Sequence, residues 1–369
     1  MNDEIAQQLL ATVMSWHQPE QPDMVRHYFP DLQLLAAYKY DGYQQFSHGR
    51  HFIESLALWL RQFEPADRQD ALDFVRDNLI FVSDAEFFHL VNIAYPDVVV
   101  PERIRLVAEE SGLPLYRIGN IVQHERFREL ELKSLYLGLS DGARTSEFRR
   151  ASGAEIRNDQ IWQAYEIGKE KSKDLLDALK DSLKASRRPS EDPRFTLIWL
   201  LDDFTASGNT YIRFQNGAYK GKLPRVFETL HQSGLVDASH YEVFLLFYVA
   251  TRQAIDHIEY WMERFTTSRR YKPLQVRVIQ LLESDIAVTS AKAPALQPLI
   301  DHPRYYDNNA ETQATRVGGT ADVRRGFANC ALPVVLCHNT PNNSLYLLWG
   351  EETFSFPGLF PRVSRHRDI

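Results

Sequence analysis

Three apolar, β-rich runs constrain the fold of this chain more than any other sequence feature. They are Phe195–Leu201, Tyr241–Ala250 and Leu274–Leu282, and helical patterns around Leu223–Gln232 and Gln253–Phe265 separate them. Strands without a polar face are typical of a parallel sheet that helices cover on both sides. The pattern therefore predicts an open α/β fold with a parallel sheet for this part of the chain.

The first third of the chain has the spacing of helices. Apolar residues recur at helical intervals from Phe52 to Phe63, and Ser83–Glu86 has the pattern of a capping box before another apolar stripe. We therefore expect a helical N-terminal domain over residues 1–120 and an α/β domain over residues 121–369.

The α/β domain contains further segments with recognisable patterns. A long amphipathic helix is expected at about Asp159–Lys184, followed by a linker at Ala185–Arg194. From Pro294 onward, Asn, Pro and Gly mark loops around one apolar run at Cys330–Cys337. We expect this tail to supply the last strands of the sheet and a loop-rich lid.

The composition argues against several classes of function. With 42 basic and 49 acidic residues and a net charge of −7, the chain is not coated in positive charge for nucleic acid, although a local basic patch remains open. Cys330 and Cys337 lack the spacing of a zinc site, and we interpret them as small buried hydrophobes. The N-terminus has no signal-peptide pattern and no stretch reaches about 18 apolar residues, so we expect a cytoplasmic protein without a membrane span.

The segment Thr196–Thr210, TLIWLLDDFTASGNT, carries the clearest chemical signal. Asp202 and Asp203 end its strand, and ligands of open α/β sheets bind at that end. Gly208 allows a close turn, and the loop amides and hydroxyls could surround a phosphate at the start of the next helix. The carboxylates would repel a phosphate but suit ribose hydroxyls, or Mg²⁺ carried by the ligand. The predicted phosphate-binding residues are Thr205, Ala206, Ser207, Gly208, Asn209 and Thr210.

A simpler interpretation of the acidic pair is a solvated Asp-Asp that caps a helix. The full string argues against it, because at these residues the chain resembles the phosphoribosyltransferase family. The resemblance implies a type I phosphoribosyltransferase-like sheet. In it, Asp202 and Asp203 hold the ribose of phosphoribosyl pyrophosphate (PRPP), and Thr205–Thr210 hold its 5-phosphate. Ala206 stands where purine-salvage members have an acidic residue that accepts a proton near the base, so the resemblance argues against purine salvage.

Two more loops are candidates for the site. Leu135–Arg144, LYLGLSDGAR, could bind pyrophosphate through Ser140, Gly142 and Arg144, or it could be an ordinary turn with a surface arginine. His338, in the loop HNTPNN, could read a base or orient a nucleophile and is our candidate for a third catalytic residue. The alternative is an Asx-turn loop in which this histidine packs.

Basic and aromatic residues outside these loops leave two interpretations open. Lys220, Lys222 and Arg225 could reach a phosphate or a nucleic-acid backbone, or they could lie on a solvated face. Aromatic residues of the tail could stack on a base or pack in the core. These residues are Tyr346, Trp349, Phe354, Phe356 and Phe360.

Over most of its length the chain also resembles the phosphoribosyltransferase-like effectors of bacterial conflict and anti-phage systems. The likeness rests on WLRQFEPADRQDALDFVRDNLIFVSDAE, LGLSDGAR…FRR, LLDDFTASGNT and HNTPNNSLYLLW…FPGLFPR. Members occur beside reverse transcriptases in some retrons, often with a winged-helix protein. The resemblance implies a toxin-like effector that a nucleoprotein partner, a reverse transcriptase with its RNA–DNA product, holds inactive.

Three functions fit these observations. The first is an enzyme that displaces a group at the anomeric carbon of a nucleotide, of PRPP or of a nucleic acid. The second is a sensor that binds a nucleotide or PRPP without turnover, as the absence of an acid at Ala206 allows. The third is a structural partner in a reverse transcriptase complex.

Overall fold

The contacts of the chain form two compact units, which divide it differently from the two domains expected from the sequence. One, the sheet unit, is Phe87–Glu283; the other, the end unit, combines Met1–Glu86 with Ser284–Ile369. The computed structural model describes residues 3–16, 23–188, 193–237, 240–311, 315 and 317–363. The expected linker at Ala185–Arg194 lies partly outside these residues, as does the end of the tail.

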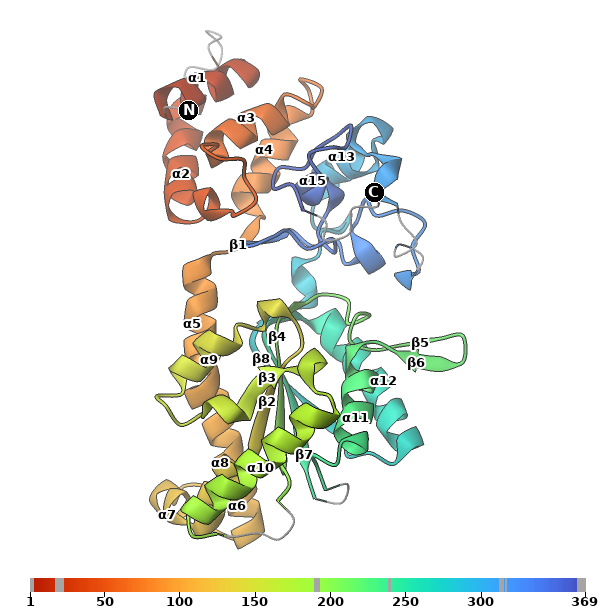
Figure 1. Ribbon diagram of the computed structural model, residues 1–369. Coiled ribbons are helices and arrows are strands. Elements are labelled where there is room, and N and C mark those ends of the chain that lie inside the picture. The colour runs from red at the N-terminus through yellow and green to blue at the C-terminus, as the bar shows by residue number, and fades with distance from the viewer. Residues whose placement is uncertain are drawn as a thin grey trace. The chain divides into compact units, whose positions relative to one another are not determined.

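The sheet unit contains a five-stranded sheet in which every pair of neighbouring strands is parallel, which confirms the predicted α/β class (Figure 1). The strand order is β3-β2-β4-β7-β8. The chain order reverses between β2 and β4, so the carboxyl ends of these two strands flank a switch point. The strands are β2 (Ser134–Gly138), β3 (Ile161–Gln163), β4 (Leu197–Thr205), β7 (Glu242–Thr251) and β8 (Leu274–Leu282).

Helices cover both faces of this sheet. On one face, Leu135 and Leu137 of β2 belong to a core that also contains apolar residues of α10 (Lys169–Ala185), α11 (Lys222–Gln232) and α12 (Arg252–Arg269). Tyr136 lies between them in sequence and therefore points to the opposite face, where it meets Phe148 of α9 (Thr145–Ala151). Burial on both faces is why the central strands β2, β4 and β7 are almost entirely apolar, whereas the edge strand β8 is half-buried and carries Gln275, Arg277 and Gln280. The remaining helices of this unit are α6 (Val100–Ser111), α7 (Ile118–Gln123) and α8 (Glu125–Leu132), while α5 (Asp84–Ala94) begins in the end unit.

Two predicted elements differ from the observed ones. The helix expected from Asp159 begins only at Lys169, because the residues before it form the short edge strand β3 and Gly168 precedes the first helical turn. A hairpin of β5 (Arg213–Gln215) and β6 (Ala218–Lys220) projects from the sheet unit where the sequence predicted a helix directly after Thr210 (Figure 1).

The sequence predicted that the tail supplies the last strands of the main sheet, but the tail does not extend that sheet. Its strand β9 (Val334–Leu336) pairs in parallel with β1 (Ile80–Val82), and this pairing joins the two ends of the chain. Phe360 is 0% exposed, and five aromatic rings surround it at centroid distances of 5.2–5.8 Å. The tail is therefore part of the core rather than a lid. The helices of this unit are α1 (Asp3–Val13), α2 (Met24–Tyr38), α3 (Phe52–Leu60), α4 (Arg68–Asp77), α13 (Gln297–Asp301) and α15 (Tyr346–Trp349).

Other sequence predictions concern the tail and the membrane. Core packing is confirmed for Tyr346, Trp349, Phe356 and Phe360, all of which are buried. Both cysteines are buried and unoxidised, as expected. Within the described ranges, none of the helices combines the length and the hydropathy that crossing a bilayer would need.

Candidate functional site

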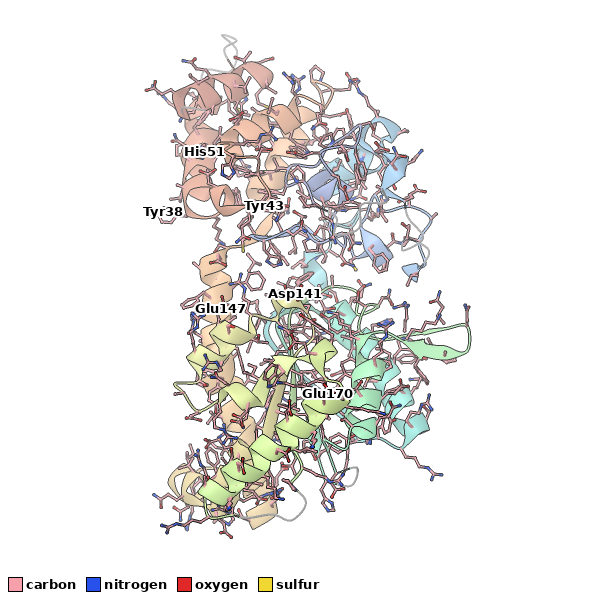
Figure 2. The ribbon with its side chains drawn as sticks, in the orientation of Figure 1. Tyr38, Tyr43, His51, Asp141, Glu147 and Glu170 are labelled. Carbon is pink, nitrogen blue, oxygen red and sulfur yellow. The ribbon has the colours of Figure 1, made fainter. Side chains whose placement is uncertain are left out.

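The two candidate loops of the sheet unit meet at the switch point. Beyond the last paired residues of β2 and β4, the amide of Leu139 donates to the carbonyl of Leu201 at 2.9 Å, and the Ser140 hydroxyl donates to Asp202. A side chain at Gly142 would collide with the Asp203 carboxylate, so glycine allows this close approach. Figure 2 labels Asp141 in the same loop, beyond that end of the sheet. The structure thus brings the predicted pyrophosphate loop to the predicted ribose-binding carboxylates.

Asp202 is fully buried, and both of its carboxylate oxygens accept hydrogen bonds. Oδ2 accepts from the Tyr211 hydroxyl at 2.6 Å and from Lys222 Nζ at 2.8 Å, while Oδ1 accepts from Ser140 and from the Asp203 amide. Burial and the nearby charge of Asp203 raise the pKa of Asp202, and Lys222 opposes that shift. Asp202 therefore ties the loop after β2 to β4 and to the start of α11.

Asp203 is the more exposed member of the acidic pair. Its Oδ1 accepts the Phe204 amide at 2.8 Å, and its Oδ2 lies against Gly142. Tyr248 of β7 donates its hydroxyl to the Ala143 carbonyl at 2.9 Å, which fixes the other side of the same loop. Burial raises the pKa of Tyr248, and the charges of Asp203 and Asp202 add to the shift.

No helix begins at the predicted phosphate-binding loop, which corrects the sequence analysis. Thr205 ends β4, and a turn follows in which the amides of Tyr211 and Ile212 both donate to the Gly208 carbonyl, at 2.9 and 3.2 Å. The hairpin comes next, with Asn216 and Gly217 at φ of 53° and 76°, as a type I′ turn requires. This Asn-Gly pair was a sequence signal for the hairpin.

The backbone of this loop nevertheless offers donors to an anion. In the portion of the chain that the structure describes, the amides of Ser207, Gly208, Asn209 and Thr210 have no hydrogen-bond acceptor. Gly208 has a φ of 74°, and a Cβ there would lie 2.9 Å from the Ala254 carbonyl of α12, so packing fixes the turn. Buried amides are rarely left without a partner, and Ser207 and Gly208 are buried. Successive unpaired amides of this kind suit a phosphate.

The other predicted residues are placed differently. The Arg144 guanidinium lies over the Phe87 ring at 5.1 Å, next to the loop that contains Ser140. Lys222, a candidate phosphate contact, pairs instead with Asp202, while Lys220 and Arg225 are exposed.

His338 follows β9 and belongs to the end unit, whereas the other predicted residues belong to the sheet unit. Its carbonyl accepts Gln45 Nε2 at 2.8 Å. The sequence analysis also missed Tyr211 and Tyr248. Tyr211 directly follows the predicted loop, but Tyr248 lies within an apolar strand and gave no signal of its own.

The carboxylates alone make a poor metal site. Among the residues that the structure describes, no group of three or more His, Cys, Asp or Glu side chains could hold a metal ion. Any Mg²⁺ would therefore need oxygen ligands from a bound phosphate in addition to Asp203.

A family model with the description PRTase-CE, which denotes a phosphoribosyltransferase-like family of conflict systems, matches residues 56–362. The matched range includes both loops of the switch point and most of the tail. Neither a curated protein nor a solved structure gives a significant match to the chain.

Proposed function

Because the chain belongs to the PRTase-CE family, we propose that its switch point binds a ribose-phosphate ligand and that the protein acts on this ligand as a defence effector. The observation that carries the proposal is the meeting of two loops at the carboxyl ends of β2 and β4. One loop supplies unpaired amides at Ser207–Thr210, and the other approaches Asp203 through Gly142. Neighbouring donors and a carboxylate match a phosphate next to ribose hydroxyls.

Each part of the site has a distinct role in this proposal. The amides of Ser207–Thr210 hold the 5-phosphate, and Asp203 accepts the ribose hydroxyls. The loop from Ser140 to Arg144 faces a second phosphate group, for which Arg144 supplies positive charge. Asp202 holds these parts in place, because its oxygens already accept hydrogen bonds from Ser140, Tyr211 and Lys222.

The reaction in this proposal displaces a group at the anomeric carbon of a nucleotide, of PRPP or of a nucleic acid. Positioning of the ligand and stabilisation of charge supply most of the catalysis. A ligand-borne Mg²⁺ would neutralise phosphate charge. The protein ligand of this ion would be the Asp203 carboxylate.

The absence of an acid at Ala206 supports a second candidate, a sensor that binds the same ligand without turnover. The two candidates share the binding site and differ only in whether a bond breaks. Pyrophosphate release in the presence of PRPP would favour the enzyme, and ligand-induced stabilisation without release would favour the sensor.

The biological context of the proposal rests on the family resemblance. We place the protein in a retron-type system, in which a reverse transcriptase with its RNA–DNA product, together with a winged-helix protein, restrains it in the cytoplasm. Co-expression with the products of neighbouring reading frames tests this part. Stable co-purification with a reverse transcriptase is expected, and toxicity should appear when that partner is left out.

Calorimetric titration with PRPP and ribose 5-phosphate tests the site itself. Asp203→Asn should weaken binding by about tenfold or more, because it removes a charged acceptor of hydroxyl groups. Asp174→Asn, on an exposed position of α10, is the matched control and should bind like the wild type. Equal affinity of wild type and Asp203→Asn would refute the assignment.

A further inference from the structure

A pocket of about 370 Å³ lies within the end unit, and none of its lining residues has a role in the proposed function. Residues 46–62 form one side of it and residues 352–361 form the other. These stretches overlap WLRQF and FPGLFPR, two strings that mark the family resemblance but have no role in the proposed function. The volume lies in the range of about 300–1,000 Å³ that is typical of small-molecule sites.

Hydrogen bonds from lining residues hold the walls of the pocket, and one of them joins its two sides. Gln62 Nε2 donates to the Pro357 carbonyl at 3.2 Å, and Trp59 Nε1 donates to the Leu347 carbonyl at 3.0 Å. The ring of Phe46, another lining residue, stacks on Phe360 with a centroid distance of 5.6 Å. Rigid walls of this kind reduce the entropy that a ligand loses on binding.

Ser55 is the clearest sign of a missing partner in this pocket. The residue is 6% exposed and lines the pocket, yet its buried hydroxyl has no hydrogen-bond partner in the described part of the chain. A helical serine usually bonds to the carbonyl four residues earlier, here that of His51, but this one does not. An unpaired buried hydroxyl is destabilising, because it has lost its hydrogen bonds to water without replacing them. A polar group of a ligand at this position would remove that destabilisation.

The charges around the pocket favour an anion. Arg50 pairs with Glu352 at 3.1 Å, so these two lining residues neutralise each other. Arg61 is exposed, and no carboxylate among the described residues pairs with its guanidinium. A guanidinium without a partner presents a planar pair of donors that matches the oxygens of a phosphate. The pocket thus has one uncompensated positive charge.

We propose that this pocket binds a mononucleotide. The phosphate pairs with Arg61, a ribose or base polar group bonds to Ser55, and the base lies against the apolar wall that Phe46, Leu58 and Pro357 form. The residues of this pocket all belong to the end unit, whereas the residues of the switch point belong to the sheet unit. A defence effector with such a site can respond to a nucleotide other than its substrate.

The test uses the full-length protein with Asp203→Asn, so that the proposed switch-point site is weakened and contributes less. Titration calorimetry with AMP, GMP, CMP and UMP should detect binding of at least one of the four. Adding Arg61→Met, which keeps an apolar stem but removes the fork, should weaken that binding about tenfold. Arg26→Met changes an exposed arginine of α2 in the same unit and should leave affinity unchanged.

Ser55→Ala separates a binding role from a structural one. Removing an unpaired hydroxyl should leave the melting temperature unchanged or raise it, whereas nucleotide affinity should fall several-fold. Absence of binding by all four nucleotides, or equal affinity with and without Arg61→Met, would overturn the proposal. If a nucleotide binds to the wild type but not to the Asp203→Asn protein, the proposal would also be overturned. That result would assign the nucleotide to the switch point instead.

Discussion

Each compact unit holds a buried aspartate, and the two carboxylates have opposite surroundings. Asp307 of the end unit is 9% exposed, and hydrogen bonds from the amides of Ser355 at 2.7 Å and Asn309 at 2.8 Å lower its pKa. Asp202 of the sheet unit lies beside Asp203, and burial together with that second charge raises its pKa. Backbone donors stabilise a structural carboxylate, whereas a like charge beside a buried one costs stability. A buried carboxylate with a like charge beside it is typical of functional sites.

The substitution with the largest expected effect tests whether the two units unfold independently. Phe360→Ala removes the ring at the centre of the aromatic cluster of the end unit, which should cost about 3–5 kcal/mol. Because the sheet unit has its own core, calorimetry should then show an early transition for the end unit and an unchanged one for the sheet unit. A single transition that shifts as a whole would show that the two units unfold together.

A smaller effect is expected from Asp202 itself. Asp202→Ala removes the acceptor of Ser140, Tyr211 and Lys222, and should lower the unfolding free energy of the sheet unit by about 2 kcal/mol. Asp203→Asn keeps an oxygen that can accept the Phe204 amide, and should change it by less than about 0.5 kcal/mol. Denaturant titration of both variants measures this contrast. Equal losses would mean that the two carboxylates do not divide structural and ligand roles.

The opposite pKa shifts predict opposite pH dependences. The stabilisation from Asp307 is present above the unfolded pKa of about 3.9 and is lost as the pH falls through its lower folded pKa. The contribution of Asp202 is present below about 3.9 and is lost as the pH rises through its raised folded pKa. Relative to wild type, the deficit of Asp307→Asn should shrink in acid, and that of Asp202→Asn should shrink as the pH rises. Denaturant unfolding between about pH 3 and 7 measures both, and slopes of the same sign would contradict the comparison.

A small effect on stability, together with a loss of ligand affinity, is expected at Gly142. Its φ is not in the left-handed region, so Gly142→Ala is tolerated by the backbone, but the new methyl group collides with the Asp203 carboxylate. Unfolding free energy should change by less than about 1 kcal/mol, while affinity for PRPP falls because the carboxylate must move. The matched control is Gly168→Ala, because a Cβ at Gly168 meets open space. Gly153→Ala is unsuitable, because Gly153 has a left-handed φ. Unchanged affinity in Gly142→Ala would separate this loop from the ligand.

The sheet was predictable from the sequence because its central strands β4 and β7 are buried on both faces and therefore stand out as apolar runs. The short strand β3 was not, since three residues carry no periodicity. The run at Cys330–Cys337 indicated a strand but not its partner, and pairing with β1 depends on contacts between the two ends of the chain.

The acidic pair of the site was predictable, but the difference between its members was not. Asp202 and Asp203 are equivalent in the sequence motif, and only the fold brings Lys222, twenty residues away, to Asp202. The amides of Ser207–Thr210 were expected to lie at a helix N-terminus. They lie instead in a turn that packing against α12 fixes, which the sequence signalled only through Gly208 and the Asn216-Gly217 pair.

Hydrogen exchange of the loop amides tests the central claim most directly. In the protein without ligand, the amides of Ser207–Thr210 have no acceptor in the described structure. They should therefore exchange faster than the hydrogen-bonded amides of the neighbouring strands. Saturating PRPP or ribose 5-phosphate should slow exchange in the peptide that contains them, and Asp203→Asn should reduce that protection at the same ligand concentration. If neither PRPP nor ribose 5-phosphate changes the exchange rate of this peptide, the result would contradict a ribose-phosphate site at the switch point.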